Sequence, residues 1–219
     1  MPDSSLPGPI QSLPAPIQRV VDAASRKGVK LDVREFDTST HTAEAAAAAV
    51  GAELGQIVKS LVFVTITETG GLEPVLCLVS GPNRVDLARL AAVTGASDIR
   101  RADANEAREL TGFPIGGIPP IGHGRVMRVV MDPDLGRFQV VWAAAGTPTA
   151  VFPVAPATLR MLSNAHVAPI CEERRQADVL AEGSGLGGST ATDGSSAAGG
   201  SSAAGGSSSQ AASPQNAGA

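Results

Sequence analysis

A loop rich in glycine and proline is the segment of the chain best suited to bind a ligand. Residues 116–124 read GGIPPIGHG, with four glycines and two prolines. Glycine permits positive φ angles and close backbone approach, and proline stiffens the chain. Such a loop can present its N–H groups to the oxygens of a ligand. The alternative is a tight connection between a helix and a strand, and the spacing matches neither a Walker phosphate loop nor a dinucleotide-binding fingerprint.

Lys59 is a second candidate for ligand binding. The chain has only three lysines, and this one stands directly before the apolar segment 60–67, which reads SLVFVTIT. An ammonium group at the mouth of a buried strand can offer a compact positive charge to a phosphate or a carboxylate. The alternative is a solvated lysine at a strand end.

The three histidines do not form a metal-binding pattern. His41, His123 and His166 have neither H-x-x-x-H nor H-x-H spacing, so we expect no metal site. His123 lies in the glycine loop, where an imidazole could hold a ribose hydroxyl or a carbonyl, whereas we interpret His166 as structural. The chain has neither a G-x-S-x-G sequence nor a local Ser-His-Asp arrangement, so nothing supports a serine or cysteine nucleophile.

Hydrophobic periodicity predicts the elements that must position these residues. Apolar residues from Ile17 to Ala24 follow helical spacing, Thr42 can cap a helix over 43–50, and Asp103 with Glu106 resembles a capping box. The segments 60–67 and 74–80 predict a hairpin of two buried strands. Further helices are predicted over 86–93 and 156–162, further strands over 31–36, 126–131, 138–143, 151–154 and 166–171, and a turn over 132–136. This mixture predicts an α/β domain with a largely antiparallel sheet.

The ends of the chain differ in composition from its middle. Residues 1–16 contain five prolines, which predicts an extended leader. In residues 183–219, glycine, serine and alanine make up 29 of 37 positions, which predicts a disordered tail over 182–219. We therefore expect one folded domain over residues 17–181.

Charge and cysteine content exclude several classes of protein. The formal net charge of −4 lacks the basic excess that a duplex-binding protein needs, so we expect no DNA partner and only local contact with nucleic acid. Cys77 lies in an apolar run and is predicted to be buried, and two cysteines are too few for a disulfide scaffold. No apolar run approaches the length of about 20 residues that spans a membrane. No secretory signal is visible, so we expect a cytoplasmic protein.

Several motifs in one order resemble a known family. The chain is similar, from about Val20 to Cys171, to the YbaK/ProX-type aminoacyl-tRNA editing domain. The motifs that carry this resemblance are residues 41–44 (HTAE), 56–63 (QIVKSLVF), 78–86 (LVSGPNRVD), 116–122 (GGIPPIG) and 144–147 (AAGT).

The resemblance implies a compact α/β domain with a mixed, largely antiparallel, curved sheet flanked by helices. It implies a hydrolase without a cofactor that deacylates mischarged aminoacyl-tRNA at the 3′-terminal adenosine. The amino acid would be small, such as alanine or cysteine on tRNA for proline. The partners would be the aminoacyl-tRNA 3′ end and prolyl-tRNA synthetase.

The resemblance also implies roles for individual residues. Lys59 would anchor the terminal phosphate or ribose, and the backbone amides of Gly116 and Gly117 would take part in catalysis. The substrate would be bound by the rest of the loop and by a pair of residues after a late strand. These residues are Ile118, Pro119, Pro120, Gly122, His123, Ala145 and Gly146.

The expected chemistry suits a site without a protein nucleophile. An aminoacyl ester is already activated, so a site can orient a water or the vicinal ribose hydroxyl and stabilise the oxyanion with backbone N–H groups. The other interpretation is a non-catalytic module that binds aminoacyl-tRNA or a nucleotide-like ligand. Retention of both Lys59 and the intact glycine loop favours the enzyme.

Overall fold

The computed structural model describes residues 13–37, 42–67 and 70–173. The predicted tail, most of the predicted leader and His41 lie outside these residues. Helix α1 (Ala15–Ser25) begins two residues before the predicted domain boundary, with proline in its first turn. Proline is tolerated there because the first N–H groups of a helix have no partner inside the helix.

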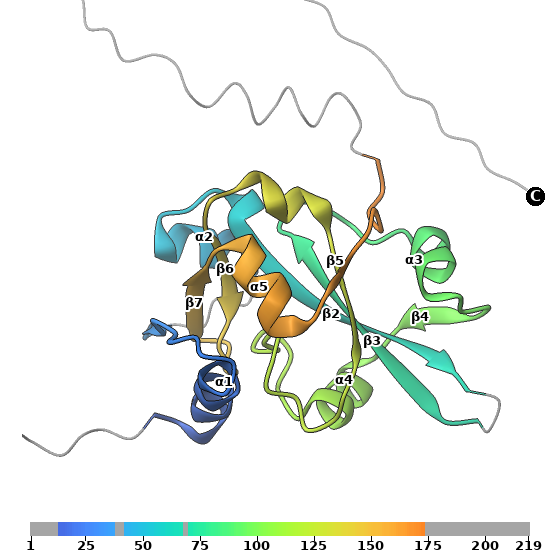
Figure 1. Ribbon diagram of the computed structural model, residues 1–219, viewed down its shortest axis with the longest axis horizontal. Coiled ribbons are helices and arrows are strands. Elements are labelled where there is room, and N and C mark those ends of the chain that lie inside the picture. Colours follow the sequence, from blue (N-terminus) through green and yellow to red (C-terminus); the bar gives the residue numbers. More distant parts are fainter. Residues whose placement is uncertain (1–12, 38–41, 68–69, 174–219) are drawn as a thin grey trace, which may run out of the picture. The chain divides into compact units, whose positions relative to one another are not determined.

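The described strands form one mixed sheet of eight strands. Its centre is the predicted hairpin, in which β2 (Ile57–Ile66) pairs antiparallel with β3 (Leu72–Ser80). Figure 1 shows these two strands crossing the domain. The other strands are β1 (Arg34–Glu35), β4 (Ile99–Arg101), β5 (Arg128–Met131), β6 (Val141–Ala144), β7 (Ala150–Val154) and β8 (His166–Val167). The order is β1-β7-β6-β2-β3-β5-β8, and β4 also pairs with β2. Four of the seven pairings are antiparallel, as predicted.

The helices begin and end where local signals predict them. In α2 (Ala43–Val50) the Thr42 side chain accepts a hydrogen bond from the Ala45 N–H. Asp103 and Glu106 form the predicted capping box of α4 (Ala104–Thr111). The remaining helices are α3 (Leu87–Thr94), α5 (Pro156–Ser163) and the 3-10 helices η1 (Leu54–Gln56) and η2 (Pro133–Arg137). No helix among the described residues is long and apolar enough to cross a membrane.

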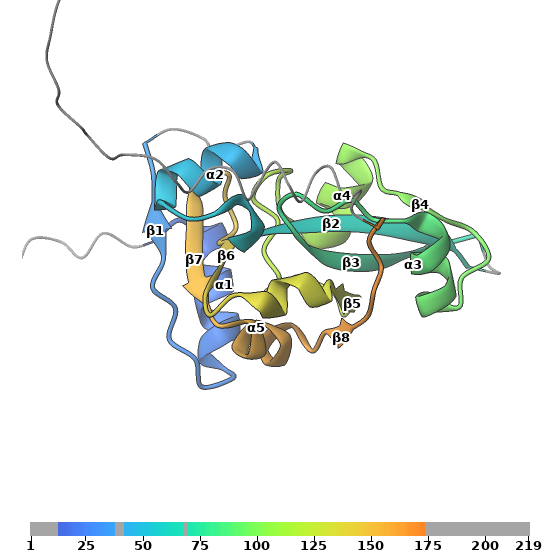
Figure 2. The ribbon, with the colours of Figure 1, turned by 90° about the horizontal axis from the view of Figure 1, so that it is seen from above.

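Alternating side chains of β2 enter different hydrophobic clusters. Val58 and Val62 join the main core, which includes apolar residues of α1, α4 and α5. Phe63 packs in a second cluster with the predicted buried Cys77, which is 0% exposed, and with α3. A third cluster joins α2 to Trp142. Figure 2 shows α2 and α5 on opposite sides of the domain, so the sheet is covered on both faces.

Several predicted elements differ from the structure. The strands predicted over 31–36 and 166–171 are reduced to the two-residue strands β1 and β8, and the predicted turn over 132–136 forms η2. The side chain of Asp132 accepts a hydrogen bond from the Asp134 N–H, which starts a helical turn instead of an open one. Strand β4 was not predicted, because its sequence IRR has no apolar alternation and its pairing with β2 is a tertiary contact.

Candidate active site

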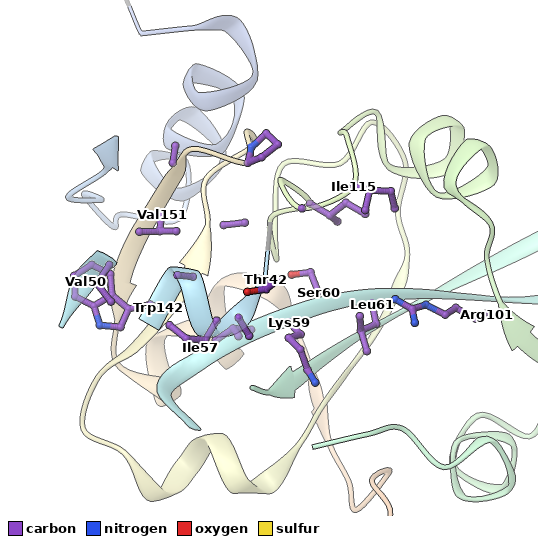
Figure 3. Close-up of a pocket in the computed structure, with 18 residues that line it drawn as sticks. Thr42, Val50, Ile57, Lys59, Ser60, Leu61, Arg101, Ile115, Trp142 and Val151 are labelled. Carbon is purple, nitrogen blue, oxygen red and sulfur yellow. The ribbon is translucent and has the colours of Figure 1, made fainter. Parts of the chain in front are cut away.

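A small pocket of about 250 Å³ lies where β2 meets α2, β6, β7 and the glycine loop. Most of its lining is apolar, from alanine and valine residues together with Trp142. Its polar lining residues are Thr42, Lys59, Ser60 and Arg101. Figure 3 shows these four side chains around the pocket, together with Ile115, which directly precedes the glycine loop. The pocket is smaller than the sites of drug-sized ligands, which occupy about 300–1,000 Å³.

The pocket lies beside a gap between β6 and β4, which both pair with the same edge of strand β2. Among the described strands, β6 pairs with β2 as far as Val58, and β4 pairs with it from Phe63 onward. The carbonyl of Val62 faces this edge, because it accepts a hydrogen bond from the Ala102 N–H at 3.0 Å. Since the direction of backbone groups alternates along a strand, the N–H and C=O of Ser60 face the same edge. The gap therefore offers one backbone donor and one backbone acceptor to a ligand.

Ser60 carries a buried hydroxyl at this gap. Among the buried side-chain polar atoms of the described residues, the Ser60 Oγ is the one without a hydrogen-bond partner. Thr42, which also lines the pocket, uses its own hydroxyl to cap α2. An unpaired buried hydroxyl is unfavourable and calls for an explanation, such as a partner that arrives with the ligand.

Lys59 leaves β2 on the face opposite to Ser60 (Figure 3). Its Nζ donates a hydrogen bond of 2.6 Å to the backbone carbonyl of Asn83. Burial lowers the pKa of Lys59, and the nearby guanidinium groups of Arg84 and Arg101 lower it further, against the opposing effects of Cys171 and Glu44. The lysine is therefore a half-buried cation with charges of both signs around it, and its ammonium group suits an anionic ligand.

The start of the glycine loop is a tight turn beside the pocket. The Gly117 N–H donates to the Pro114 carbonyl at 3.0 Å, and Gly116 has a φ of 83°, as the third residue of a type II turn requires. Gly116 and Ile118 line the pocket. Among the described residues, neither of their N–H groups donates a hydrogen bond. The Gly117 N–H, which was predicted to act together with that of Gly116, is used within the turn, whereas the Gly116 and Ile118 N–H groups have no partner in the described part of the chain.

Gly117 is buried beneath this turn, and its φ is not positive. A Cβ at this position would come 2.6 Å from the carbonyl carbon of Thr147. Pro119 and Pro120 are also buried, and they do not line the pocket. Close approach of two backbones therefore explains the glycine at 117, whereas backbone conformation explains Gly116.

His123 packs against Phe113 instead of lining the pocket. The two rings form an edge-to-face pair with centroids 5.9 Å apart, and the His123 Nε2 lies 2.9 Å from the Pro119 carbonyl. Burial lowers the pKa of His123 to about 4, with a smaller effect in the same direction from Arg19 and an opposing one from the bond to Pro119. At neutral pH the imidazole is uncharged and, through an Nε2–H, donates to that carbonyl. The structure thus places His123 in support of the loop.

Helix α1 holds the glycine loop from behind. The Arg19 guanidinium lies 4.0 Å from the centre of the Phe113 ring and donates to the carbonyls of Gly112 and Gly122. Gly122 has a φ of 86°, and a Cβ there would come 3.3 Å from the Arg19 carbonyl oxygen. One side chain therefore contacts both the end of α4 at Gly112 and the glycine loop at Gly122.

The predicted pair Ala145 and Gly146 lies beside the pocket but does not line it. Ala145 is 0% exposed in the main core, and Gly146 has a φ of 104° with no room for a Cβ next to the Pro16 carbonyl. Their neighbours Ala144 and Pro148 line the pocket instead. The pocket therefore touches the same turn as the predicted pair, one or two residues away along it.

Several lining residues were not predicted as site residues. Thr42 was recognised as a helix cap and Ser60 as the start of a strand, and both also line the pocket. Arg101 and Trp142 come from separate strands, and no local pattern marks them. Within the described residues, no group of three or more His, Cys, Asp or Glu side chains could hold a metal ion.

Comparison with known proteins decides the family. A family model described as the aminoacyl-tRNA editing domain matches residues 37–162. The chain belongs to this family. The aminoacyl-tRNA editing domain therefore includes Lys59, the glycine loop and the 144–147 turn, and the predicted resemblance is confirmed. Helix α1 lies outside the matched segment, although it supports the loop.

The alignments with individual relatives cover most of the length of each relative. YwhH of Bacillus subtilis (strain 168) is 34% identical over 132 residues, which are 60% of this chain and 81% of YwhH. The multifunctional Ser/Thr-tRNA deacylase ProXp-y of Escherichia coli (strain K12) is 32% identical over 134 residues, 59% of this chain and 77% of that protein.

A solved structure confirms the predicted fold of the editing domain. It is the crystal structure of a protein assigned as a trans-editing enzyme for prolyl-tRNA synthetase. The two structures superpose with a TM-score of 0.67 at 47% sequence identity, over 74% of this chain and 100% of that chain.

Proposed function

We propose that this protein is a hydrolase that removes a wrongly attached small amino acid from the 3′-terminal adenosine of tRNA. The observation that carries the proposal is the small apolar pocket at the sheet gap, lined by Gly116 and Ile118, whose N–H groups donate no hydrogen bond to the described residues. The aminoacyl-tRNA editing family and the deacylase ProXp-y among its relatives support this activity.

The pocket favours a small amino acid. Alanine and valine residues of α2, β6 and β7 line it, and Trp142 closes one side. A volume of about 250 Å³ has room for a short side chain and its ester group, but a long side chain would displace the lining. Alanine and cysteine fit this description.

Hydrolysis would need no group from the protein that bonds covalently to the substrate. A water attacks the ester carbonyl, and the carbonyl oxygen becomes an oxyanion that the N–H groups of Gly116 and Ile118 stabilise. The C–O bond to the ribose then breaks, and the ribose oxygen takes up a proton as the free amino acid leaves. The vicinal ribose hydroxyl, next to the reacting carbonyl, can orient the water. Each aligned donor of this kind is worth about 100- to 1,000-fold in rate.

The cations beside the pocket would hold the tRNA end. Lys59 is half-buried, whereas Arg84 and Arg101 are exposed, and both arginines lie close enough to lower the pKa of Lys59. A few positive charges can bind the phosphates of a single-stranded end without the basic surface that a duplex requires. Prolyl-tRNA synthetase would supply the mischarged tRNA, in the cytoplasm.

A panel of mischarged tRNAs tests the proposal. Alanyl-, cysteinyl-, seryl- and threonyl-tRNA for proline are incubated with the protein, with correctly charged prolyl-tRNA as the control. We expect release of free amino acid from at least one tRNA that carries a small wrong amino acid, and little release of proline from prolyl-tRNA. Binding of mischarged tRNA without release would instead identify a non-catalytic module.

A further inference from the structure

Lys59 is held in place by a chain of buried polar groups that ends in a carboxylate. The Lys59 Nζ donates to the Asn83 carbonyl at 2.6 Å. The Asn83 side-chain amide donates to the Asp132 Oδ2 at 2.7 Å and to the Asp134 Oδ2 at 2.9 Å. Asn83 is 5% exposed and Asp132 is 2% exposed, so the contact between them is buried, and the other two contacts are partly buried.

The same groups also fix the backbone of the segment that carries Asn83. The Asn83 N–H donates to the Ser80 carbonyl at 2.9 Å, which closes a turn after β3. The Asp132 Oδ2 also accepts a hydrogen bond from the Ser80 N–H at 3.2 Å. One carboxylate oxygen of Asp132, the N-cap of η2, therefore bonds to both ends of the turn and restrains the segment that carries the Asn83 carbonyl. This arrangement accounts for the asparagine of the 78–86 motif.

The arrangement restrains the ammonium group without neutralising it. Two carboxylates lie one contact away, yet none of the ion pairs among the described residues includes Lys59. The Asn83 side-chain amide stands between these carboxylates and the lysine, and the neutral backbone carbonyl of Asn83 accepts the hydrogen bond from Nζ. An ammonium has three donors, so the remaining N–H groups and the positive charge stay available to an anion.

We propose that Asn83 and Asp132 are positioning residues that hold Lys59 in the orientation required to bind the substrate. The inference rests on the proposed function for the identity of the substrate. Asn83→Ala removes the anchoring side chain and keeps the backbone carbonyl that Lys59 uses. Asp132→Asn keeps the shape and replaces one acceptor by a donor.

The first test observes the lysine directly in the free protein. With three lysines in the chain, 13Cε labelling gives three sets of NMR signals, which Lys→Arg substitutions assign. We expect two distinct Hε signals for the restrained Lys59, which merge in Asn83→Ala and in Asp132→Asn. Leu135→Val removes packing from the same helix η2 without touching these polar contacts, and in it the signals should stay distinct. Distinct Lys59 signals in Asn83→Ala would overturn the proposal.

The second test measures deacylation. Asn83→Ala should lower kcat/KM about tenfold in the wild-type background and should have no further effect in Lys59→Ala, because coupled residues are not additive. Equal losses in both backgrounds would show a purely structural role for Asn83. If the wild-type protein releases no amino acid from any mischarged tRNA, the proposed function fails, while the NMR comparison still decides whether Asn83 positions Lys59.

Discussion

Gly117 and Thr147 lie backbone against backbone, so that a Cβ on Gly117 would come 2.6 Å from the Thr147 carbonyl carbon. This contact joins the glycine loop to the turn after β6. It fixes the adjacent Gly116 and Ile118, whose N–H groups face no partner among the described residues. The contact therefore links the packing of the domain to the proposed oxyanion site.

Gly117→Ala should reduce both stability and activity. The added methyl group forces the two backbones apart, and we expect the free energy of unfolding to fall by about 1–3 kcal/mol. Deacylation should fall as well, because the N–H groups on the rim of the pocket move. Denaturant unfolding and turnover measure the two effects. Gly124→Ala is the matched control, since no atom lies within 4 Å of its Cβ position; equal losses in both variants would contradict the packing argument.

Lys59→Ala should abolish most deacylation and leave the fold intact. The variant loses one hydrogen bond, worth about 1 kcal/mol of stability. Its kcat/KM should fall at least about 30-fold, because a half-buried charge that pairs with the substrate is removed. Lys59→Arg should also be poor, since a guanidinium does not match the position of a compact ammonium. Lys27→Ala is the control, because Lys27 bonds to the Leu162 carbonyl and does not line the pocket; near-wild-type turnover of Lys59→Ala would remove Lys59 from the site.

Ser60→Ala should stabilise the free protein. Removing a buried hydroxyl that has no partner among the residues described by the structure should raise the free energy of unfolding by about 1 kcal/mol. If the substrate supplies the partner, kcat/KM should fall at the same time. Ser163→Ala is the matched control, because the Ser163 hydroxyl donates to the Leu159 carbonyl at 2.7 Å and its removal should not stabilise. A destabilised Ser60→Ala protein with unchanged kcat/KM would show that the hydroxyl is satisfied within the protein.

His123 should make stability depend on pH. Its pKa falls from 6.5 to about 4 on folding, so the folded state binds fewer protons between these values than the unfolded state does. The uncharged His123 therefore contributes to the free energy of unfolding in full above pH 6.5. This contribution, up to about 3 kcal/mol, is lost as the pH falls from 6.5 through 4. His123→Gln should lose less stability than the wild type between pH 7 and pH 4. Equal losses, measured by denaturant unfolding at both values, would contradict the low pKa.

The same residue tests the mechanism. His123→Ala should lower turnover about tenfold, through a looser glycine loop, because the imidazole supports the loop and does not act as a base. A complete loss of turnover, together with loss of an acidic limb near the imidazole pKa in the pH–rate profile, would instead identify His123 as the general base.

The sequence by itself determined the parts of this protein that depend on neighbours a few residues apart. Thr42 caps α2 and Asp103 with Glu106 caps α4, as their types and spacing predict. The hairpin of β2 and β3 follows from two apolar runs around a short turn. The order of the motifs also identified the family, because type and spacing are properties of the chain alone.

Only the tertiary structure decided which residues share the pocket and which support it. Lys59 meets Asn83, Gly117 meets Thr147, and Arg19 holds Gly122, and each of these pairs joins segments that are distant in the sequence. Local preferences cannot specify such contacts, since they arise when the sheet order places β6 and β4 on the same edge of β2. His123 was predicted to bind the substrate, but its ring packs against Phe113 and does not line the pocket. This contact, too, is made by the tertiary structure.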